Sequence, residues 1–176
     1  MGETVIREMI PGDLGAVGTL AGDLVRVHHH FDSRRFFLTK GVEDGYRWYF
    51  TKLLTEKDAK SVLLVAEVEG QVAGYVYGSI EPRDWAKLLD VHGAIHDVMV
   101  SDAYRRRGLA KLLMLEAMRV LREAGAPRVV LYSATPNVQA QALFASIGFR
   151  STMIEMTYDA PIAAASTSIR ETNSSI

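Results

Sequence analysis

The chain has 176 residues, of which 48% are hydrophobic and 23% charged, and its formal net charge is −1. This composition is typical of one globular domain, and the balanced charge excludes a global field that favours nucleic acid or an anionic membrane. The absence of cysteine excludes disulfides, thiolate metal sites and a cysteine acyl-enzyme. No apolar run approaches the ~20 residues of a membrane span, and no signal-peptide pattern is present, so we expect a cytoplasmic protein without membrane or nucleic-acid partners.

The first half of the chain predicts a strand, two helices and a β-hairpin. The two strands of the hairpin are rich in Val, Leu and Tyr, and apolar residues recur at helical spacing in the helices. Asp13 follows a Pro-Gly break and is a candidate N-cap for the first helix, and Gly70 predicts the tight turn of the hairpin. The predicted boundaries are 4–9 for the strand, 14–25 and 41–54 for the helices, and 61–69 with 71–80 for the hairpin.

The second half continues the alternation and predicts an α/β (α+β) fold with a central sheet. Residues 1–159 form the predicted domain, and residues 160–176 are rich in Ala, Ser and Thr without a periodic apolar face. We expect this tail to be mobile or held by a partner chain. The predicted elements are strand 94–100, helix 108–124, strand 128–133, helix 137–147 and a closing strand at 149–158.

An anion-binding site is predicted where the strand 94–100 leads into the most clearly periodic helix. The sequence there is Arg-Arg-Arg-Gly-Leu-Ala, from Arg105 to Ala110. The first turn of a helix presents unpaired N–H groups and the positive end of its dipole. Gly108 lets the backbone approach a ligand closely, and the arginines supply forked donors for phosphate oxygens. The alternative interpretation is a solvated basic helix start without a ligand.

The pattern Arg-x-x-Gly-x-Ala resembles the Gln/Arg-x-x-Gly-x-Gly/Ala signature of the GNAT acetyltransferases. The resemblance covers residues 4–158 and implies the GNAT fold: a central mixed, mostly antiparallel sheet flanked by helices, with a splayed central strand. It also implies acetyl-CoA as cosubstrate, no metal, and transfer of an acetyl group to an amine. A second family motif at the next helix supports it; its residues are Asn137, Ala140, Leu143, Gly148 and Phe149.

The resemblance also implies which residues hold acetyl-CoA. The backbone of the central strand would pair with the pantetheine arm, and the loop with the first helical turn would hold the pyrophosphate. Asn137 would contact the arm, and Phe144 would lie near the thiol. The alternatives are core packing for the strand residues and Phe144, and an ordinary helix N-cap for Asn137. The implied cofactor-binding residues are Val98, Met99, Val100, Arg105, Arg106, Arg107, Gly108, Leu109, Ala110, Lys111, Asn137, Ala140 and Phe144.

The central strand offers His96 and Asp97 for acid–base chemistry. Only about a few in ten thousand lysine-like amines are neutral at pH 7, so amine acetylation calls for a base. Strand alternation predicts that His96 shares a face with Ala94 and Val98 and that Asp97 points the other way. The family's glutamate base would fall at Ala94, so we interpret His96 as the base, acting through water, and Asp97 as a group that orients a neighbour or binds the amine. The alternatives are a structural histidine and an aspartate that hydrogen-bonds buried backbone.

The general acid is not assigned, because many relatives place a tyrosine where this chain has Phe144. Tyr132 and Ser133, at the end of the adjacent strand, are candidates; the alternatives are water and a thiolate that leaves unprotonated. On the acceptor side, residues 28–30 form a histidine triplet. Consecutive helical residues do not share a face, so a three-histidine metal site is not expected.

The sequence therefore predicts an N-acetyltransferase that acts on a primary amine of a small molecule or peptide, by direct attack in a ternary complex. The absence of cysteine favours this route over a ping-pong route. The alternatives are an acetyl-CoA-binding module with little or no catalysis and a nucleic-acid binder that uses the arginines. His96 favours the enzyme, and the balanced charge disfavours nucleic acid. The closing strand and the tail are candidates for a homodimer interface.

Overall fold

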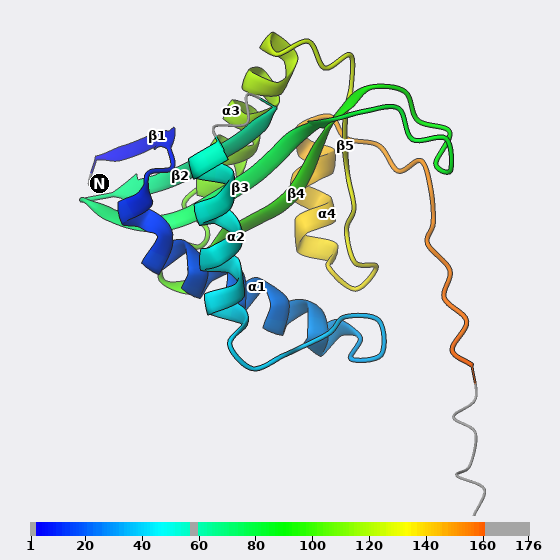
Figure 1. Ribbon diagram of the computed structural model, residues 1–176, viewed down its shortest axis with the longest axis horizontal. Helices are drawn as coiled ribbons and strands as arrows, with labels where there is room; N and C mark the ends of the chain where they lie inside the picture. The colour runs from blue at the N-terminus through cyan, green and yellow to red at the C-terminus, as the bar shows by residue number, and fades with distance from the viewer. Residues whose placement is uncertain (1–2, 57–59, 161–176) are drawn as a thin grey trace, which may run out of the picture.

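A five-stranded mixed sheet forms the centre of the fold (Figure 1). The computed structural model describes residues 3–56 and 60–160. Neighbouring strands are antiparallel except for the last pair, which is parallel. The sheet is therefore mixed and mostly antiparallel, as the resemblance implied. In sheet order the strands are β1 (Thr4–Glu8), β2 (Ser61–Val68), β3 (Gln71–Glu81), β4 (His92–Val100) and β5 (Val129–Leu131).

Helices cover both faces of the sheet, so the described residues form three layers. On one face, Val17 and Phe50 pack against Tyr75 of β3 in one core cluster. On the other face, Leu113 and Phe144 belong to a second cluster. The first face carries α1 (Leu14–Phe31) and α2 (Val42–Glu56), and the second carries α3 (Leu109–Glu123) and α4 (Val138–Ser146). None of the helices in the described part of the chain has the length and apolar content that crossing a membrane requires.

The hairpin between β2 and β3 turns as the sequence predicts. Glu69 and Gly70 both have positive φ, at 51° and 77°. Two successive left-handed residues are the conformation of a two-residue type I′ turn, whose twist matches that of the flanking strands. The local chemistry of the turn therefore sets the register of this hairpin.

A β-bulge in β4 changes which way its central residues point. The register pairs Tyr77 with Asp97 and Gly78 with Ile95, which leaves His96 as an extra residue without a partner on β3. A bulge of this kind interrupts the alternation of side chains along a strand. At Gly78 the two strands approach so closely that an added Cβ would lie 2.8 Å from the carbonyl oxygen of Ala94. Any other residue at position 78 would push the strands apart.

The bulge overturns the predicted orientation of His96 and Asp97. The His96 ring stacks on Tyr77 at a centroid distance of 4.7 Å, and Asp97 accepts a hydrogen bond from the Tyr75 hydroxyl. Tyr75 and Tyr77 both belong to the core cluster under α1 and α2. His96 and Asp97 therefore lie on the same face of β4, whereas regular alternation would have placed them on opposite faces.

The central strands separate early. β4 and β5 pair over three residues only, from Gly93–Val129 to Ile95–Leu131. Beyond Ile95, β4 continues to Val100 without a β5 partner in the described residues. This is the splayed central strand that the sequence implied, and it opens the sheet between its fourth and fifth strands.

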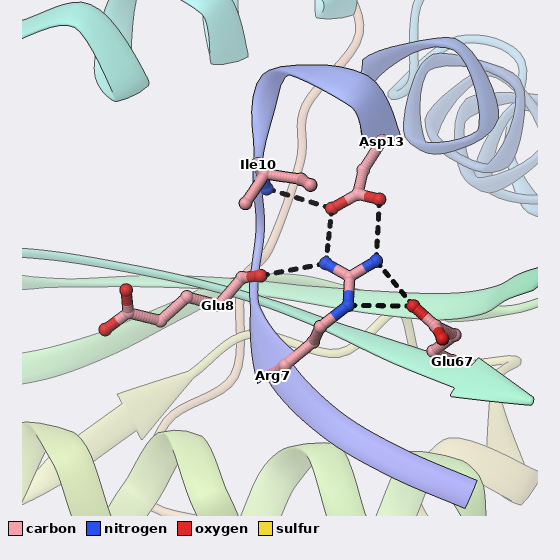
Figure 2. A network of polar contacts seen from close by, with 5 residues as sticks. All are labelled: Arg7, Glu8, Ile10, Asp13 and Glu67. Atoms are coloured by element: carbon pink, nitrogen blue, oxygen red, sulfur yellow. Dashed lines mark hydrogen bonds and ion pairs between the residues drawn. The ribbon is translucent and has the colours of Figure 1, made fainter. Parts of the chain in front are cut away.

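An arginine network ties β1 to β2 and to the start of α1 (Figure 2). The Arg7 guanidinium donates to both carboxylate oxygens of Asp13 at 2.7 and 2.9 Å, and its Nε donates to Glu67 at 2.8 Å. Asp13 also accepts from the N–H of Ile10 at 2.9 Å and makes no cap hydrogen bond to α1. Asp13 therefore closes the 3-10 turn Pro11–Asp13. The prediction that Asp13 caps the following helix through its side chain is wrong.

The predicted closing strand at 149–158 is wrong. The chain leaves α4 through Gly148, whose φ is +99°, and residues 150–160 belong to no strand and are exposed. A strand needs a neighbour to satisfy its backbone, and this segment has none in the described part of the chain. Of the predicted tail, residues 161–176 lie outside the described residues.

We expect Asp13→Asn to lower the free energy of unfolding by about 1–3 kcal/mol, because it breaks a buried, charge-assisted pair. Burial alone would raise the pKa of Asp13, but the hydrogen bonds from Arg7 and from the Ile10 N–H outweigh it and hold the pKa below the ordinary 3.8. The stabilisation is therefore present above pH 3.8 and lost as the pH falls further. Denaturant titrations of both proteins at pH 7 and below pH 3.8 measure it.

The control is Asp23→Asn, because Asp23 pairs with Arg26 on the exposed face of α1. Exposed pairs of this kind contribute little, so the control should change stability by less than about 0.5 kcal/mol. Equal stability of Asp13→Asn and the unsubstituted chain at pH 7 would contradict the role given to the network.

Candidate active site

A cleft of about 260 Å³ lies where β4 and β5 separate. One side of the cleft is formed by α1, α2 and the connection between them, and the other by the end of β5 and the start of α4. The cleft therefore passes through the sheet and touches both helix layers. Its lining includes Leu24, His28, Phe36, Tyr46, Ile95, His96, Asp97, Val98, Leu131, Tyr132, Ser133, Asn137, Ala140 and Phe144.

His96 is held in the cleft wall by two residues of β3. Its Nε2 lies 2.6 Å from the Ser79 hydroxyl and 3.3 Å from a carboxylate oxygen of Glu81. The Ser79 hydroxyl in turn lies 2.5 Å from Oε1 of Glu81. On the flat side of the ring, Tyr77 stacks against the imidazole, and its hydroxyl lies 2.9 Å from that of Tyr49 on α2. The ring orientation is therefore fixed at its edge and at its face.

The contacts also determine which nitrogen of His96 carries the proton. An ionised carboxylate has no proton to give, so the Ser79 hydroxyl donates to Glu81. The Ser79 oxygen then accepts from Nε2 of His96, which must be protonated. In the neutral ring this leaves Nδ1 without a proton, and Nδ1 is the basic nitrogen.

The surroundings keep His96 neutral near pH 7. Burial lowers the pKa of His96 below the ordinary 6.5, and the carboxylate of Glu81 opposes this shift without cancelling it. A neutral imidazole can accept a proton, whereas an imidazolium cannot. The site therefore presents a base at neutral pH.

Asp97 is a carboxylate in the same wall that forms no ion pair in the described residues. Its Oδ2 accepts from the Tyr75 hydroxyl at 3.3 Å. Burial raises the pKa of Asp97 to about 6, while the hydrogen bond from Tyr75 and the electrostatic effect of His28 oppose this increase. A buried carboxylate without an ion-pair partner is costly. This environment favours a ligand that brings a positive group.

The loop 105–108 leads into α3 with two left-handed residues. The φ angles of Arg106 and Gly108 are +66° and +80°, and Gly108 is the N-cap of α3 without a side-chain cap. The first N–H groups of the helix therefore face an uncapped end. Arg105 pairs with Asp102 at 2.7 Å, and Arg107 lies over the Tyr104 ring.

Arg106 and Lys111, by contrast, have no polar partner in the described residues. Two unpaired cations beside an uncapped helix start suit phosphate groups. The geometry is compatible with the anion site that the sequence predicted at this helix start, and it leaves Arg106 as the arginine without a partner among the described residues.

The structure brings some of the sequence-predicted residues together and separates others. The predicted residues that line the cleft are His96, Asp97, Val98, Tyr132, Asn137, Ala140 and Phe144. The side chains of Met99 and Val100 are buried in the core clusters instead, one on each face of the sheet. The loop and the first turn of α3, at 105–111, lie outside the cleft lining, beyond the end of β4.

The candidate acids differ in their surroundings. Tyr132 is 68% exposed, and its ring lies 5.7 Å from the Lys87 ammonium. The Ser133 hydroxyl is buried and has no hydrogen-bond partner in the described residues. Asn137 accepts from the N–H of Ala140 at 3.3 Å and so does act as an N-cap. Unpaired buried hydroxyls are rare, and that of Ser133 belongs to a residue that lines the cleft.

Ser79 is a functional candidate that sequence reasoning missed; for Glu81, at the end of the hairpin, the sequence suggested attraction of a cationic amine and not a contact with His96. Alternation along β3 places Tyr77, Ser79 and Glu81 on one face. The sequence of β3 therefore indicated that these side chains share a face. It did not indicate that β4 pairs beside them in a register that brings His96 into contact. His28 and Tyr46 also line the cleft, and they come from separate helices.

The histidine triplet does not form a cluster. His28 Nδ1 donates to the Leu24 carbonyl, and His29 Nδ1 donates to the Phe36 carbonyl, each at 2.8 Å. Within residues 3–56 and 60–160, no group of three or more His, Cys, Asp or Glu side chains is placed to hold a metal ion.

Replacing Glu81 with glutamine should lower the pKa of His96 further, because the carboxylate that favours the imidazolium is lost. Proton NMR titration of the His96 ring measures the change, with His96→Gln used to assign the signal. Glu123→Gln, on α3, is the matched control and should leave the titration unchanged. An unaltered pKa in Glu81→Gln would contradict the contact between Glu81 and His96.

Comparison with known proteins agrees with the geometry. The family model "Acetyltransferase (GNAT) family" matches residues 25–149. N-acetyltransferase 8 of Homo sapiens is 34% identical over 92 residues, which are 52% of this chain and 40% of that protein. Mycothiol acetyltransferase of Thermomonospora curvata is 29% identical over 99 residues, which are 56% of this chain and 31% of that protein.

A solved structure of an aminoglycoside N-acetyltransferase in complex with CoA superposes with a TM-score of 0.67 at 17% identity, over 92% of this chain and 97% of that chain. This likeness concerns the fold. This chain spans about a third of the length of the curated relatives it first matches. Because the family model covers most of the sequence, including both predicted motifs, the chain belongs to the acetyltransferase (GNAT) family.

Proposed function

We propose that this chain is an acetyl-CoA-dependent N-acetyltransferase that acetylates a primary amine of a small molecule or peptide. The observation that carries the proposal is the setting of His96. A neutral imidazole with a free Nδ1 is fixed by Ser79 and Glu81 in a cleft that opens the sheet. A module that only binds acetyl-CoA has no need of such a base.

Groups suited to holding acetyl-CoA lie along β4 and at the starts of α3 and α4. Arg106, Lys111 and the uncapped N–H groups at the start of α3 would hold the pyrophosphate. The pantetheine arm carries amides, and the backbone of Val98 on the unpaired edge of β4 offers hydrogen-bonding groups to them. Asn137 and Phe144 would flank the arm at the start of α4. When bound, acetyl-CoA supplies an activated acetyl thioester.

His96 removes the proton that the acceptor amine loses. The amine nitrogen forms a bond to the thioester carbon while the carbon–sulfur bond breaks and CoA leaves as a thiolate. Nδ1 of His96 takes the proton, directly or through one water, and Glu81 stabilises the imidazolium that forms. The chain has no cysteine, which favours direct attack in a ternary complex over an acyl-enzyme.

Ser133 is the better of the two candidates to stabilise the leaving thiolate. Phe144 has no proton to give, and Tyr132 is largely exposed beside Lys87. The buried Ser133 hydroxyl lacks a partner in the described residues and lines the cleft with Phe144. A hydrogen bond from this hydroxyl to the sulfur would satisfy both groups.

Asp97 would anchor the acceptor through its ammonium group. Among the described residues that line the cleft, Asp97 supplies the carboxylate, and it forms no ion pair there. The rest of the acceptor side combines Leu24, Phe36 and Tyr46 with His28 and with Arg35, whose guanidinium pairs with Glu155. This lining suits a compact amine with an apolar body.

We expect acetyl-CoA to bind with a Kd on the order of micromolar, and Arg106→Glu and Gly108→Glu each to weaken binding by at least about tenfold. The first places a negative charge where the diphosphate lies, and the second also strains a backbone at positive φ. Isothermal titration calorimetry measures the affinity. Arg122→Glu, near the other end of α3, should bind as the unsubstituted chain does, and failure of the unsubstituted chain to bind would refute the proposed function.

His96→Gln and Asp97→Asn should affect different kinetic constants in a thiol-release assay with a screened amine. His96→Gln lowers kcat by about 10²- to 10⁴-fold with acetyl-CoA affinity unchanged. Asp97→Asn raises KM for the amine by about tenfold or more, because a charge-assisted bond is lost, and leaves KM for acetyl-CoA unchanged. In the unsubstituted enzyme, activity rises with pH through a pKa below 6.5. Full activity of His96→Gln would contradict the assignment of His96 as the base. Asp23→Asn, which changes an exposed side chain of α1, is the control and should leave both constants unchanged.

A further inference from the structure

A second hollow, of about 540 Å³, adjoins the cleft of the active site. The two hollows meet at Ile95, His96 and Tyr132, which line both. The connection between β3 and β4, residues 82–91, contributes one wall, and Figure 1 shows it reaching beyond the end of the sheet. We call this hollow the hairpin groove; its lining includes Glu81, Trp85, Lys87, His92, His96 and Tyr132.

The wall formed by the connection is an ordered turn whose charges are already paired. Asp84 and Leu89 exchange two backbone hydrogen bonds, of 2.8 and 3.0 Å. Arg83 donates to both carboxylate oxygens of Asp90, each at 3.0 Å, and the Lys87 ammonium lies 3.1 Å from the Asp84 carboxylate. The turn therefore adds no uncompensated charge to the groove.

His92 brings a buried nitrogen without a partner to the groove. The residue is only 6% exposed, and its Nδ1 lies 2.8 Å from the backbone carbonyl oxygen of Asp90. A carbonyl oxygen only accepts, so Nδ1 carries the proton, and in the neutral ring Nε2 is an acceptor. Nε2 has no hydrogen-bond partner within residues 3–56 and 60–160. Buried polar atoms are nearly always paired, so this nitrogen indicates a ligand with a hydrogen-bond donor.

Glu81 lies beside His92, because the two residues are register partners of β3 and β4. Side chains of directly opposite residues lie next to each other on one face of a sheet. Oε1 of Glu81 makes the contacts to Ser79 and His96, and Oε2 has no partner in the described part of the chain. The groove thus presents two neighbouring acceptors, one of them charged. An ammonium group has three N–H donors and a positive charge, so one such group satisfies both, whereas a hydroxyl has a single donor.

We propose that the acceptor is a diamine: one amine is acetylated at His96, while the other, as an ammonium, binds between Glu81 and His92 in the hairpin groove. This inference rests on the proposed function and names its substrate class. The reacting amine lies at Asp97, and a methylene chain runs past Tyr132, which borders both hollows. The second ammonium keeps its protons and takes no part in the bond changes.

A series of α,ω-diamines, from diaminobutane to diaminodecane, tests the spacing. His92 and His96 are four residues apart on β4, a span of at most about 13 Å. In the thiol-release assay, kcat/KM of the best diamine should exceed that of the alkylamine of equal length by at least about tenfold, because two charge-assisted bonds are gained. Two equivalent ends explain only a doubling. A diamine that is no better than its matched alkylamine at every length would overturn the proposal.

Two substitutions of His92 separate its contact with the ligand from its contact with Asp90. The amide of His92→Asn takes the place of Nδ1 and still donates to the Asp90 carbonyl, but it leaves nothing at Nε2. It should lower kcat/KM for the diamine by about tenfold and leave that for the alkylamine unchanged. His92→Gln places an amide oxygen near Nε2 and should retain the preference for the diamine. His30→Asn, the same exchange at an exposed position of α1, is the control. Equal losses for both substrates in His92→Asn would indicate a structural role and contradict the proposal.

Calorimetric titration with the same amines, with and without CoA, needs no turnover and therefore separates the two proposals. The diamine should bind the unsubstituted chain at least about tenfold more tightly than the alkylamine, and His92→Asn should abolish the difference. If the diamine binds preferentially but no amine releases thiol from acetyl-CoA, the proposed function fails and the ammonium site stands. If the alkylamine is acetylated and both amines bind equally, the ammonium site alone is refuted.

Discussion

The early separation of β4 from β5 is the constraint on which the rest of the structure depends. The two strands pair over three residues, and β4 then runs on from His96 to Val100 with its backbone open on that side. Buried backbone groups must find hydrogen-bond partners, so an opening inside a sheet suits a ligand that carries such groups itself. Residues of both helix layers contribute to the lining of this opening.

The bulge at His96 determines which titratable side chains line this opening. It turns His96 and Asp97 to the same face, where burial acts on their charges in opposite senses. Desolvation lowers the pKa of an imidazole and raises that of a carboxyl, since both neutral forms are favoured. One strand irregularity thus places an imidazole with a lowered pKa and a carboxyl with a raised pKa on the same face of β4. Glu81 moderates the first effect, and Tyr75 moderates the second.

The two edges of the sheet differ in the contacts that stabilise them. The Arg7 network fastens β1 to β2 and to the turn before α1, so this edge is locked by ion pairs within the chain. At the other edge, β5 is short and open, and the segment that follows α4 leaves without pairing. The ion pairs stabilise the edge at β1, whereas the edge at β5 lies next to the cleft, through Tyr132 and Ser133.

Local patterns in the sequence determined the order of the elements, the hairpin turn at Gly70 and the basic helix start at Gly108, because these depend on residues that are neighbours in the chain. The family motifs likewise indicated the splayed strand. Only the tertiary structure decided the side to which His96 points and its contact with Glu81, since both follow from the register between β3 and β4. The tertiary structure also decided that residues 149–158 form no strand in the described part of the chain. Their composition is a local property, whereas a strand forms only where another backbone lies beside it.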